Sequence, residues 1–161
     1  MSTQSMPAVV HRSPADRTAR RLIALGALLF FLGLLAGLVV PVVTNPRMGV
    51  SAHLEAVMNG MFLIAIGAVW SRLSLPPGLM PWASGLLSFG AYVNCFFVGL
   101  AAVFGASKTM PLAGAGYAAL PWQENLVTLG LTIAALAMLA GGALLVWGFF
   151  RREDSVETGA A

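Results

Sequence analysis

The sequence predicts an all-α integral membrane protein, a four-helix transmembrane bundle, and three observations carry this prediction. The chain has 161 residues, of which 58% are hydrophobic and only 9% are charged, whereas a soluble domain has about 25% charged residues. The hydrophobic residues gather in four long runs, and each run reaches the roughly 20 residues that a helix needs to cross a bilayer. The breaks between the runs are rich in Pro and Gly, which interrupt helices.

The expected spans lie near residues 22–43, 52–73, 81–105 and 125–150. A segment inside lipid must satisfy its own backbone hydrogen bonds, which favours helices, and the runs are too long and too uniform for barrel strands. Residues 1–21 are then expected to form a flexible basic N-terminal tail, residues 22–150 one transmembrane domain, and residues 151–161 a C-terminal tail.

The distribution of positive charge predicts how the helices cross the membrane. One side of the predicted spans collects Arg12, Arg17, Arg20, Arg21, Arg72, Arg151 and Arg152. The other side has only Arg47 and Lys108. Since Lys and Arg are retained on the cytoplasmic side, both termini are expected there. The pI of about 9.8 does not indicate nucleic-acid binding, because no basic stripe interleaved with aromatic residues is present.

Small residues recur along the first two spans. Gly33 and Gly37 form a GxxxG pair, and Ala52, Ala56 and Gly60 repeat at a spacing of four residues. Such residues let helices approach closely in lipid. They indicate helix packing within one bundle or, alternatively, contacts between subunits.

Polar side chains within the apolar runs are the candidates for chemistry, because hydrocarbon disfavours them. They are His53, Glu55, Asn59, Tyr92, Asn94, Glu124 and Asn125. Most of them fall toward the outer half of the predicted bundle. Glu55 and Asn59 are four residues apart and share a helix face, whereas His53 lies about 200° away from Glu55 around the helix. One of these faces could look into the bundle and the other toward a neighbouring subunit.

Each candidate also has a structural interpretation. His53 is either a metal or haem ligand or a proton carrier, or a hydrogen-bonded histidine at a helix start. Glu55 is either a functional acid or an N-terminal acid stabilised by the helix dipole. Glu124 is expected to be structural for the same reason. Asn94 could serve a site or join two helices, and Tyr92 is more typical of packing.

Several catalytic patterns are absent from the sequence. It has no CxxC, HExxH, P-loop or GxSxG motif, so no nucleotide cofactor is expected. The only cysteine, Cys95, lies in an apolar run and is expected to act as a small hydrophobic residue. The ligand count excludes a structural zinc site. The residues alone therefore predict a small membrane protein with one polar pocket.

The segment 45–59 reads NPRMGVSAHLEAVMN and continues with Gly60 and Met61. Together with the Gly- and Leu-rich first span, it closely resembles hydroxylaminobenzene mutase, a small membrane enzyme of bacterial nitroaromatic catabolism. The resemblance implies an isomerase of the bacterial inner membrane that rearranges aryl hydroxylamines such as hydroxylaminobenzene to ortho-aminophenols. Its small aromatic substrate would arrive through the lipid bilayer.

A more distant resemblance is to styrene oxide isomerase, a four-helix membrane enzyme that is a trimer with haem b between its subunits. In that family the ligand histidine is followed six residues later by Asn-Gly, as His53 is here by Asn59 and Gly60. The resemblance implies that His53 binds haem iron and that Asn94 lies near the substrate. It also implies a homo-oligomer, with a trimer favoured.

Two departures from the isomerase pattern predict a related pocket with another substrate. Val98 stands where the isomerase has Tyr, and Gly90 stands where it has Asp. Tyr92 could supply a hydroxyl instead. The resemblance thus implies a mutase with Asn59, Asn94, Glu55 and Tyr92 as catalytic candidates. Two alternatives are an epoxide isomerase and a non-catalytic membrane subunit or carrier.

Overall fold

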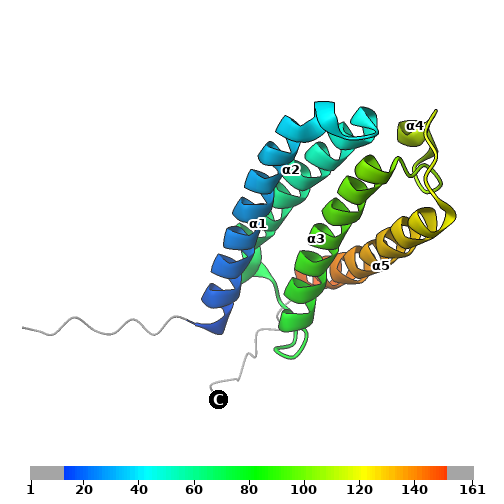
Figure 1. Ribbon diagram of the computed structural model, residues 1–161. Helices are drawn as coiled ribbons and strands as arrows, with labels where there is room; N and C mark the ends of the chain where they lie inside the picture. The colour runs from blue at the N-terminus through cyan, green and yellow to red at the C-terminus, as the bar shows by residue number, and fades with distance from the viewer. Residues whose placement is uncertain (1–12, 152–161) are drawn as a thin grey trace, which may run out of the picture.

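The computed structural model describes residues 13–151, and within them the fold is all-helical (Figure 1). Four long helices dominate: α1 (Pro14–Val39), α2 (Pro46–Val69), α3 (Met80–Phe104) and α5 (Pro121–Phe150). Two 3-10 turns, η1 (Val40–Val42) and η2 (Trp70–Arg72), end the first two helices, and the short helix α4 (Pro111–Gly114) lies in the last connection. All four long helices are long and apolar enough to cross a membrane, as the sequence predicts.

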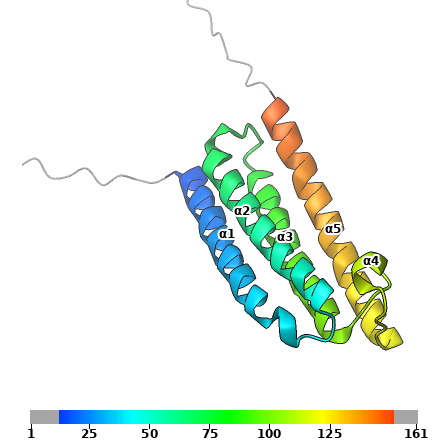
Figure 2. The same ribbon diagram turned by 90° about the horizontal axis from the view of Figure 1, so that it is seen from above.

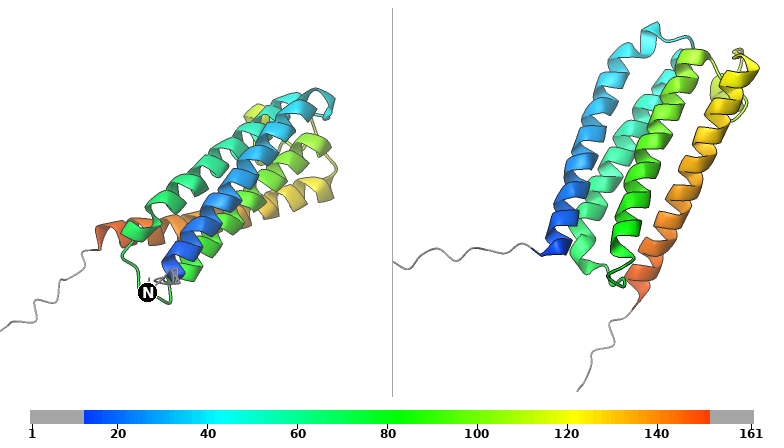
Figure 3. Two further views of the ribbon diagram at one scale, coloured as in Figure 1. Left: turned by 90° about the vertical axis from the view of Figure 1, so that its left-hand side faces the viewer. Right: turned by 60° about the horizontal axis from the view of Figure 1, so that its bottom comes forward.

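The helices are arranged as an open row rather than a closed ring. α1 packs on α2, α2 packs on α3, and α3 packs on α5, while α1 and α3 barely meet. Figure 3 shows this order clearly in its right-hand view, with α1 and α5 at opposite edges. The row leaves many large apolar side chains exposed on every long helix, as is typical of a surface that contacts lipid or another subunit.

Three helices begin earlier than the sequence predicts: α5 starts at Pro121 rather than near residue 125, and α1 and α2 start earlier by larger margins. α1 starts at Pro14, inside the predicted tail of residues 1–21, because Ser13 caps it: the Ser13 hydroxyl accepts from Asp16 N, and Asp16 returns a bond to Ser13 N. α2 starts at Pro46 rather than near residue 52, with Asn45 as its cap. The remaining parts of the predicted tails, 1–12 and 152–161, lie outside the described residues.

The interface between α1 and α2 depends on the small residues. A Cβ added at Gly26 would lie 2.6 Å from the Gly60 carbonyl oxygen, and one at Gly60 would lie 2.5 Å from Phe30 N. One at Gly33 would lie 2.9 Å from Ala56 Cβ. The two backbones are therefore in direct contact, so the glycine pattern serves packing within one chain.

The connection between α3 and α5 is fastened to the start of α2. Asn45 is fully buried; its Oδ1 accepts from Met48 N at 3.2 Å, and its Nδ2 donates to Ala113 O at 2.9 Å. Arg47 donates to Ala115 O, and the Thr44 hydroxyl donates to Val103 O at 2.7 Å. The conspicuous residues at the start of the 45–59 segment thus join three parts of the chain.

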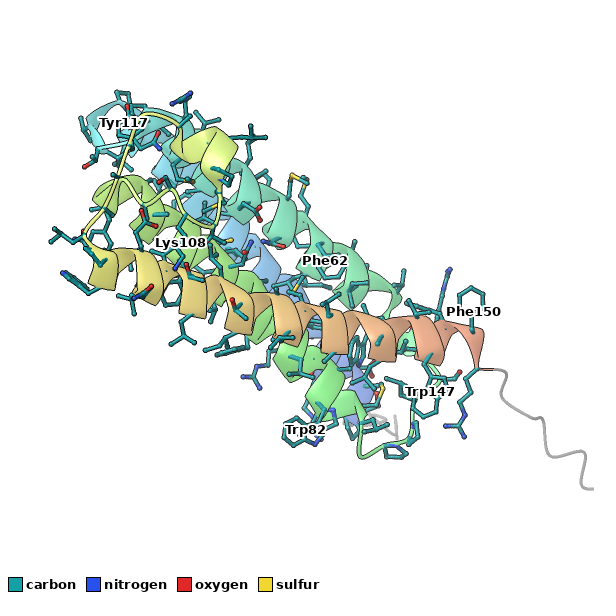
Figure 4. The ribbon with its side chains drawn as sticks, turned by 90° about the vertical axis from the view of Figure 1, so that its right-hand side faces the viewer. Phe62, Trp82, Lys108, Tyr117, Trp147 and Phe150 are labelled. Atoms are coloured by element: carbon teal, nitrogen blue, oxygen red, sulfur yellow. The ribbon has the colours of Figure 1, made fainter. Side chains whose placement is uncertain are left out.

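The start of α1 and the end of α5 lie at the same end of the bundle along the helix axes (Figure 2). Figure 4 places Trp82, Trp147 and Phe150 at that end, and Lys108 and Tyr117 at the opposite end. An even number of crossings produces this arrangement. The positions of the termini relative to the cytoplasm stay a prediction from the arginine distribution.

Candidate functional site

The centre of the candidate site is a carboxylate that receives two amides. Asn94 of α3 donates from Nδ2 to Glu55 Oε2 at 2.6 Å, and Asn59 of α2 donates from Nδ2 to the same oxygen at 3.3 Å. All three side chains are half-buried. α2 supplies Glu55 and Asn59 one turn apart, as the spacing predicts, and α3 brings Asn94 against them. The structure therefore gathers three of the four predicted catalytic side chains.

The hydrogen bonds fix how the two amides are turned. An ionised carboxylate only accepts hydrogen bonds, so each amide must present its nitrogen to Glu55. The Oδ1 atoms of Asn59 and Asn94 then face away from the carboxylate, and neither makes a hydrogen bond within the described residues. Glu55 Oε1 is likewise unbonded there. The cluster thus offers three acceptor atoms in a largely apolar environment.

Cys95 is a neighbour of the cluster that the sequence analysis does not identify. Asn59 Nδ2 lies 3.5 Å from Cys95 Sγ, so the thiol accepts a weak hydrogen bond from the same amide. The sequence places Cys95 directly after Asn94, but only the packing of α3 on α2 brings it to Asn59. The thiol is nevertheless not simply a small hydrophobic side chain.

Cys95 also lines an apolar groove of about 370 Å³ between α1 and α3, to which α2 contributes Gly49 and Ala52. Small side chains form much of its wall, among them Ala36, Gly49, Ala52 and Gly99. Ligand sites for small molecules are concave and mainly apolar, with a few polar groups. The groove is therefore an apolar chamber whose wall touches the polar cluster through Cys95.

His53 lies on another face of α2 and points toward α1. Its Nδ1 is 2.7 Å from Gly33 O, and a Cβ added at Gly37 would lie 2.9 Å from the same nitrogen. The expected separation of His53 from the face of Glu55 is confirmed. The ring is seated between α1 and α2 because glycine at position 37 leaves room for it.

The contact with Gly33 sets the tautomer of His53. A carbonyl oxygen only accepts, so Nδ1 carries the hydrogen and Nε2 keeps its lone pair. Nε2 makes no hydrogen bond within the described residues. Metal-binding histidines are commonly held in this way, with the other ring nitrogen donating to a backbone carbonyl. The geometry therefore fits a histidine that would hold a haem iron through Nε2.

The described residues contain no group of three or more His, Cys, Asp or Glu side chains that could hold a bare metal ion. A haem would bring four nitrogen ligands of its own, so a single histidine would be enough to hold it. His53 is compatible with that requirement.

His53 is hydrogen-bonded, as its structural interpretation expects, but neither His53 nor Glu55 lies at a helix start, since α2 begins at Pro46. His53 and Glu55 lie about two turns inside the helix, beyond the first turn where the helix dipole acts. Glu55 therefore needs another explanation for its place in the apolar span, and the two amides provide its solvation.

Tyr92 is directed away from the cluster. Its hydroxyl donates to Leu25 O on α1 at 2.8 Å, so this structure does not bring the fourth predicted catalytic side chain to Glu55. It joins α1 to α3 instead, in agreement with a packing role.

Glu124 has the structural role that was expected. Its carboxylate accepts from the backbone N–H groups of Ser107 at 2.9 Å, Lys108 at 3.0 Å and Ala119 at 3.3 Å. It thereby holds the α3–α5 connection in place. Asn125 beside it accepts from Lys108 Nζ at 3.4 Å, also in this connection.

Comparisons with known proteins find relatives over most of the chain. A model of the styrene oxide isomerase family matches residues 18–150. Hydroxylaminobenzene mutase HabB of Ectopseudomonas oleovorans is 45% identical over 131 residues, which cover 81% of this chain and 80% of the relative. Hydroxylaminobenzene mutase HabA of the same organism is 42% identical over 131 residues, covering 81% of this chain and 97% of the relative. No solved structure matches the chain significantly.

The match covers all four long helices and includes every residue of the polar cluster. The relatives that match over most of their length are isomerases, so this chain has a mutase or isomerase function. It belongs to the styrene oxide isomerase family, with hydroxylaminobenzene mutases among its relatives.

Proposed function

We propose that this protein is an intramolecular mutase that rearranges aryl hydroxylamines, such as hydroxylaminobenzene, to ortho-aminophenols within the membrane. The convergence of Asn59 and Asn94 on Glu55 carries the proposal, because it provides polar groups for the substrate inside an apolar span. The identity to two hydroxylaminobenzene mutases supports the substrate class.

The reaction balances without any external oxidant or reductant. The N–O bond breaks, a C–O bond forms at the ortho carbon, and the ortho hydrogen leaves as a proton while the nitrogen gains one. Substrate and product are isomers. A base that takes the first proton and returns it to nitrogen is therefore sufficient for the proton transfers.

Glu55 is the residue that we assign to this proton transfer. Its Oε2 is held by two amides, and its Oε1 makes no hydrogen bond within the described residues. The amides stabilise the carboxylate, and the free oxygen can accept a proton.

Asn59 and Asn94 would position the polar end of the substrate. With their nitrogens engaged by Glu55, their Oδ1 atoms can accept from the N–H and O–H groups of a hydroxylamine. Holding these groups beside Glu55 keeps the substrate protons within reach of the carboxylate. This positioning lowers the entropic cost of reaching the reactive geometry.

The apolar surroundings would protect the reaction from water. Breaking the N–O bond creates an electron-poor aryl nitrogen species that bulk water could capture. The groove lined by Cys95 is apolar and lies within the membrane-spanning helices, so it offers the aromatic ring a route from lipid to the cluster. Excluding water also strengthens the polar contacts with Glu55.

We further propose that His53 binds haem b through Nε2. When bound, this group would supply a Lewis-acidic iron that withdraws electron density from a substrate oxygen. Gly33 O would hold the imidazole in the required tautomer, and Gly37 would leave space for the ring. No nucleotide cofactor is needed for an isomerisation.

A homo-oligomer, with a trimer favoured, would bring His53 of one subunit close to the Glu55 cluster of another. His53 and Glu55 point to different neighbours in one chain. A neighbouring subunit packed on the open row could bring one chain's His53 toward another's Glu55 cluster. We place this assembly in a bacterial inner membrane as a multi-pass protein with both termini in the cytoplasm, on the basis of the arginine distribution.

Product analysis tests the proposed activity. Membranes containing the protein are incubated with hydroxylaminobenzene and no added cofactor, and the products are separated by chromatography. Formation of 2-aminophenol above the level of empty-vector membranes supports the mutase. Folded protein with no conversion contradicts it.

The second candidate is an epoxide isomerase, which the name of the matching family favours. Against it, Val98 and Gly90 replace the Tyr and Asp of the isomerase pattern. Formation of phenylacetaldehyde from styrene oxide in the same membranes distinguishes the two substrates. The identity to enzymes over most of the chain argues against a non-catalytic carrier.

A further inference from the structure

A second and larger groove lies toward the opposite end of the helices from α4 and shares no lining residue with the polar cluster. It has a volume of about 720 Å³. The first turns of α1, the buried Trp70 of η2, the loop before α3 and the first turns of α3 form its walls. α1 and α3 make few contacts with each other, and the groove lies between them.

The floor and the mouth of this groove differ in chemistry. Its depth is apolar, with Leu22, Trp70 and Leu75 almost completely buried. Polar groups accompany them: the guanidinium of Arg21 is exposed, and the Ser88 hydroxyl makes no hydrogen bond within the described residues. The groove is thus amphipathic, with room for an apolar chain and a cation for an anion.

Positive charge is concentrated around this groove. The described residues at this end include Arg17, Arg20, Arg21, Arg72 and Arg151. The only described acid there is Asp16, whose carboxylate already caps α1 by accepting from Ser13 N. This end of the bundle, along the helix axes, is therefore strongly cationic. The ends of transmembrane helices lie near the lipid headgroups.

We propose that this groove binds an anionic phospholipid, with its phosphate at Arg21 and one acyl chain lying over Leu22, Trp70 and Leu75. Basic pockets between transmembrane helices on the cytoplasmic side are suited to anionic headgroups. An apolar floor beside the cation selects a lipid over a free phosphate. The bound lipid would fill the space between α1 and α3 that no side chain fills.

Gly85 provides a direct test of the site. It lines the groove, and a Cβ added there meets nothing within 4 Å. Gly85→Leu therefore fills the groove without a clash in the backbone. Gly142 on α5 is the matched control, because its Cβ also meets nothing within 4 Å and it does not line the groove.

The experiment is native mass spectrometry of the full-length protein in detergent, with phosphatidylglycerol, phosphatidylcholine or inorganic phosphate added. We expect one phosphatidylglycerol per polypeptide, with much weaker adducts of phosphatidylcholine and phosphate. Gly85→Leu should abolish the phosphatidylglycerol adduct, and Gly142→Leu should retain it. Arg21→Gln, at an exposed position that folding does not need, should weaken the adduct about fivefold, which corresponds to ~1 kcal/mol per basic residue near an anionic surface.

Three results would overturn the proposal. Equal adducts of phosphatidylglycerol and phosphatidylcholine would remove the role of Arg21. An adduct of inorganic phosphate as strong as that of phosphatidylglycerol would remove the role of the apolar floor. A Gly85→Leu protein that keeps its lipid but loses subunits from its native mass would assign the groove to a second copy of the chain instead.

Discussion

Asn94 Nδ2 donates a 2.6 Å hydrogen bond to Glu55 Oε2, and this contact joins α3 to α2 within the membrane-spanning part of the protein. A charge-assisted bond between two helices could be structural alone. The second amide from Asn59 and the unbonded Oε1 distinguish it, because a purely structural carboxylate would use both of its oxygens. Glu124, in the first turn of α5, does so: its two oxygens accept from backbone N–H groups of the α3–α5 connection.

Glu55→Gln should lower kcat by about 100-fold or more, since the amide keeps the shape of the side chain but cannot carry the proton. The measurement is 2-aminophenol formation per folded protein. Glu124→Gln is the matched control, because Glu124 is a carboxylate with a structural role. It should lower thermal stability and leave kcat per folded protein unchanged. A Glu55→Gln protein with full activity would exclude proton transfer by this residue.

His53→Ala should lose the Soret absorption band of bound haem together with the activity. Added imidazole should restore part of both, because it can occupy the space left by the ring and bind the iron. A change that only disturbed the packing of α1 on α2 would not respond to imidazole. Full activity together with an intact Soret band in His53→Ala would contradict the ligand assignment.

Gly99→Leu should lower kcat/KM about tenfold, mainly through KM, because the side chain would enter the groove lined by Cys95. The size of the effect is that expected for blocking part of an apolar subsite. A Cβ at Gly99 meets nothing within 4 Å, so the fold should tolerate the change. Gly142→Leu should have no effect. Equal kinetics for Gly99→Leu and wild type would separate the groove from the substrate path.

Asn45→Ala should lower the free energy of unfolding by about 2 kcal/mol, because it removes a helix cap and leaves Ala113 O without its donor. Thermal unfolding followed by circular dichroism measures the loss. The activity of the protein that is still folded at low temperature should be close to wild type. An unchanged Tm would contradict the role of Asn45 as the residue that fastens the α3–α5 connection.

Periodicity and composition were sufficient to predict four helices, since apolar length is the dominant constraint in lipid. α1, α2 and α5 all begin before the residues at which the predicted spans start. The differences are largest at the starts of α1 and α2. Both starts follow one local rule, in which a capping Ser13 or Asn45 precedes a proline. Pro46 lies in one of the Pro- and Gly-rich segments between the apolar runs, but it forms the first turn of α2, a position to which proline is well suited.

Within the candidate site, the sequence predicted the relations between residues of one helix but not the contacts between helices. The four-residue spacing of Glu55 and Asn59 fixes their common face, and the two-residue offset separates His53 from them. The partners that cross between helices depend on how α3 packs against α2, which the sequence of either helix does not specify. Asn94, Cys95 and Tyr92 therefore needed the structure, and only there did Tyr92 turn toward α1.

The most direct test of the central claim uses hydroxylaminobenzene labelled with 18O in its hydroxyl group, incubated in ordinary water with membranes that contain the protein. An intramolecular mutase predicts 2-aminophenol that retains the 18O label, at a level above that of empty-vector membranes and strongly reduced in Glu55→Gln. Unlabelled 2-aminophenol, with its oxygen taken from water, would contradict the intramolecular reaction, and no 2-aminophenol above the empty-vector level would contradict the activity itself.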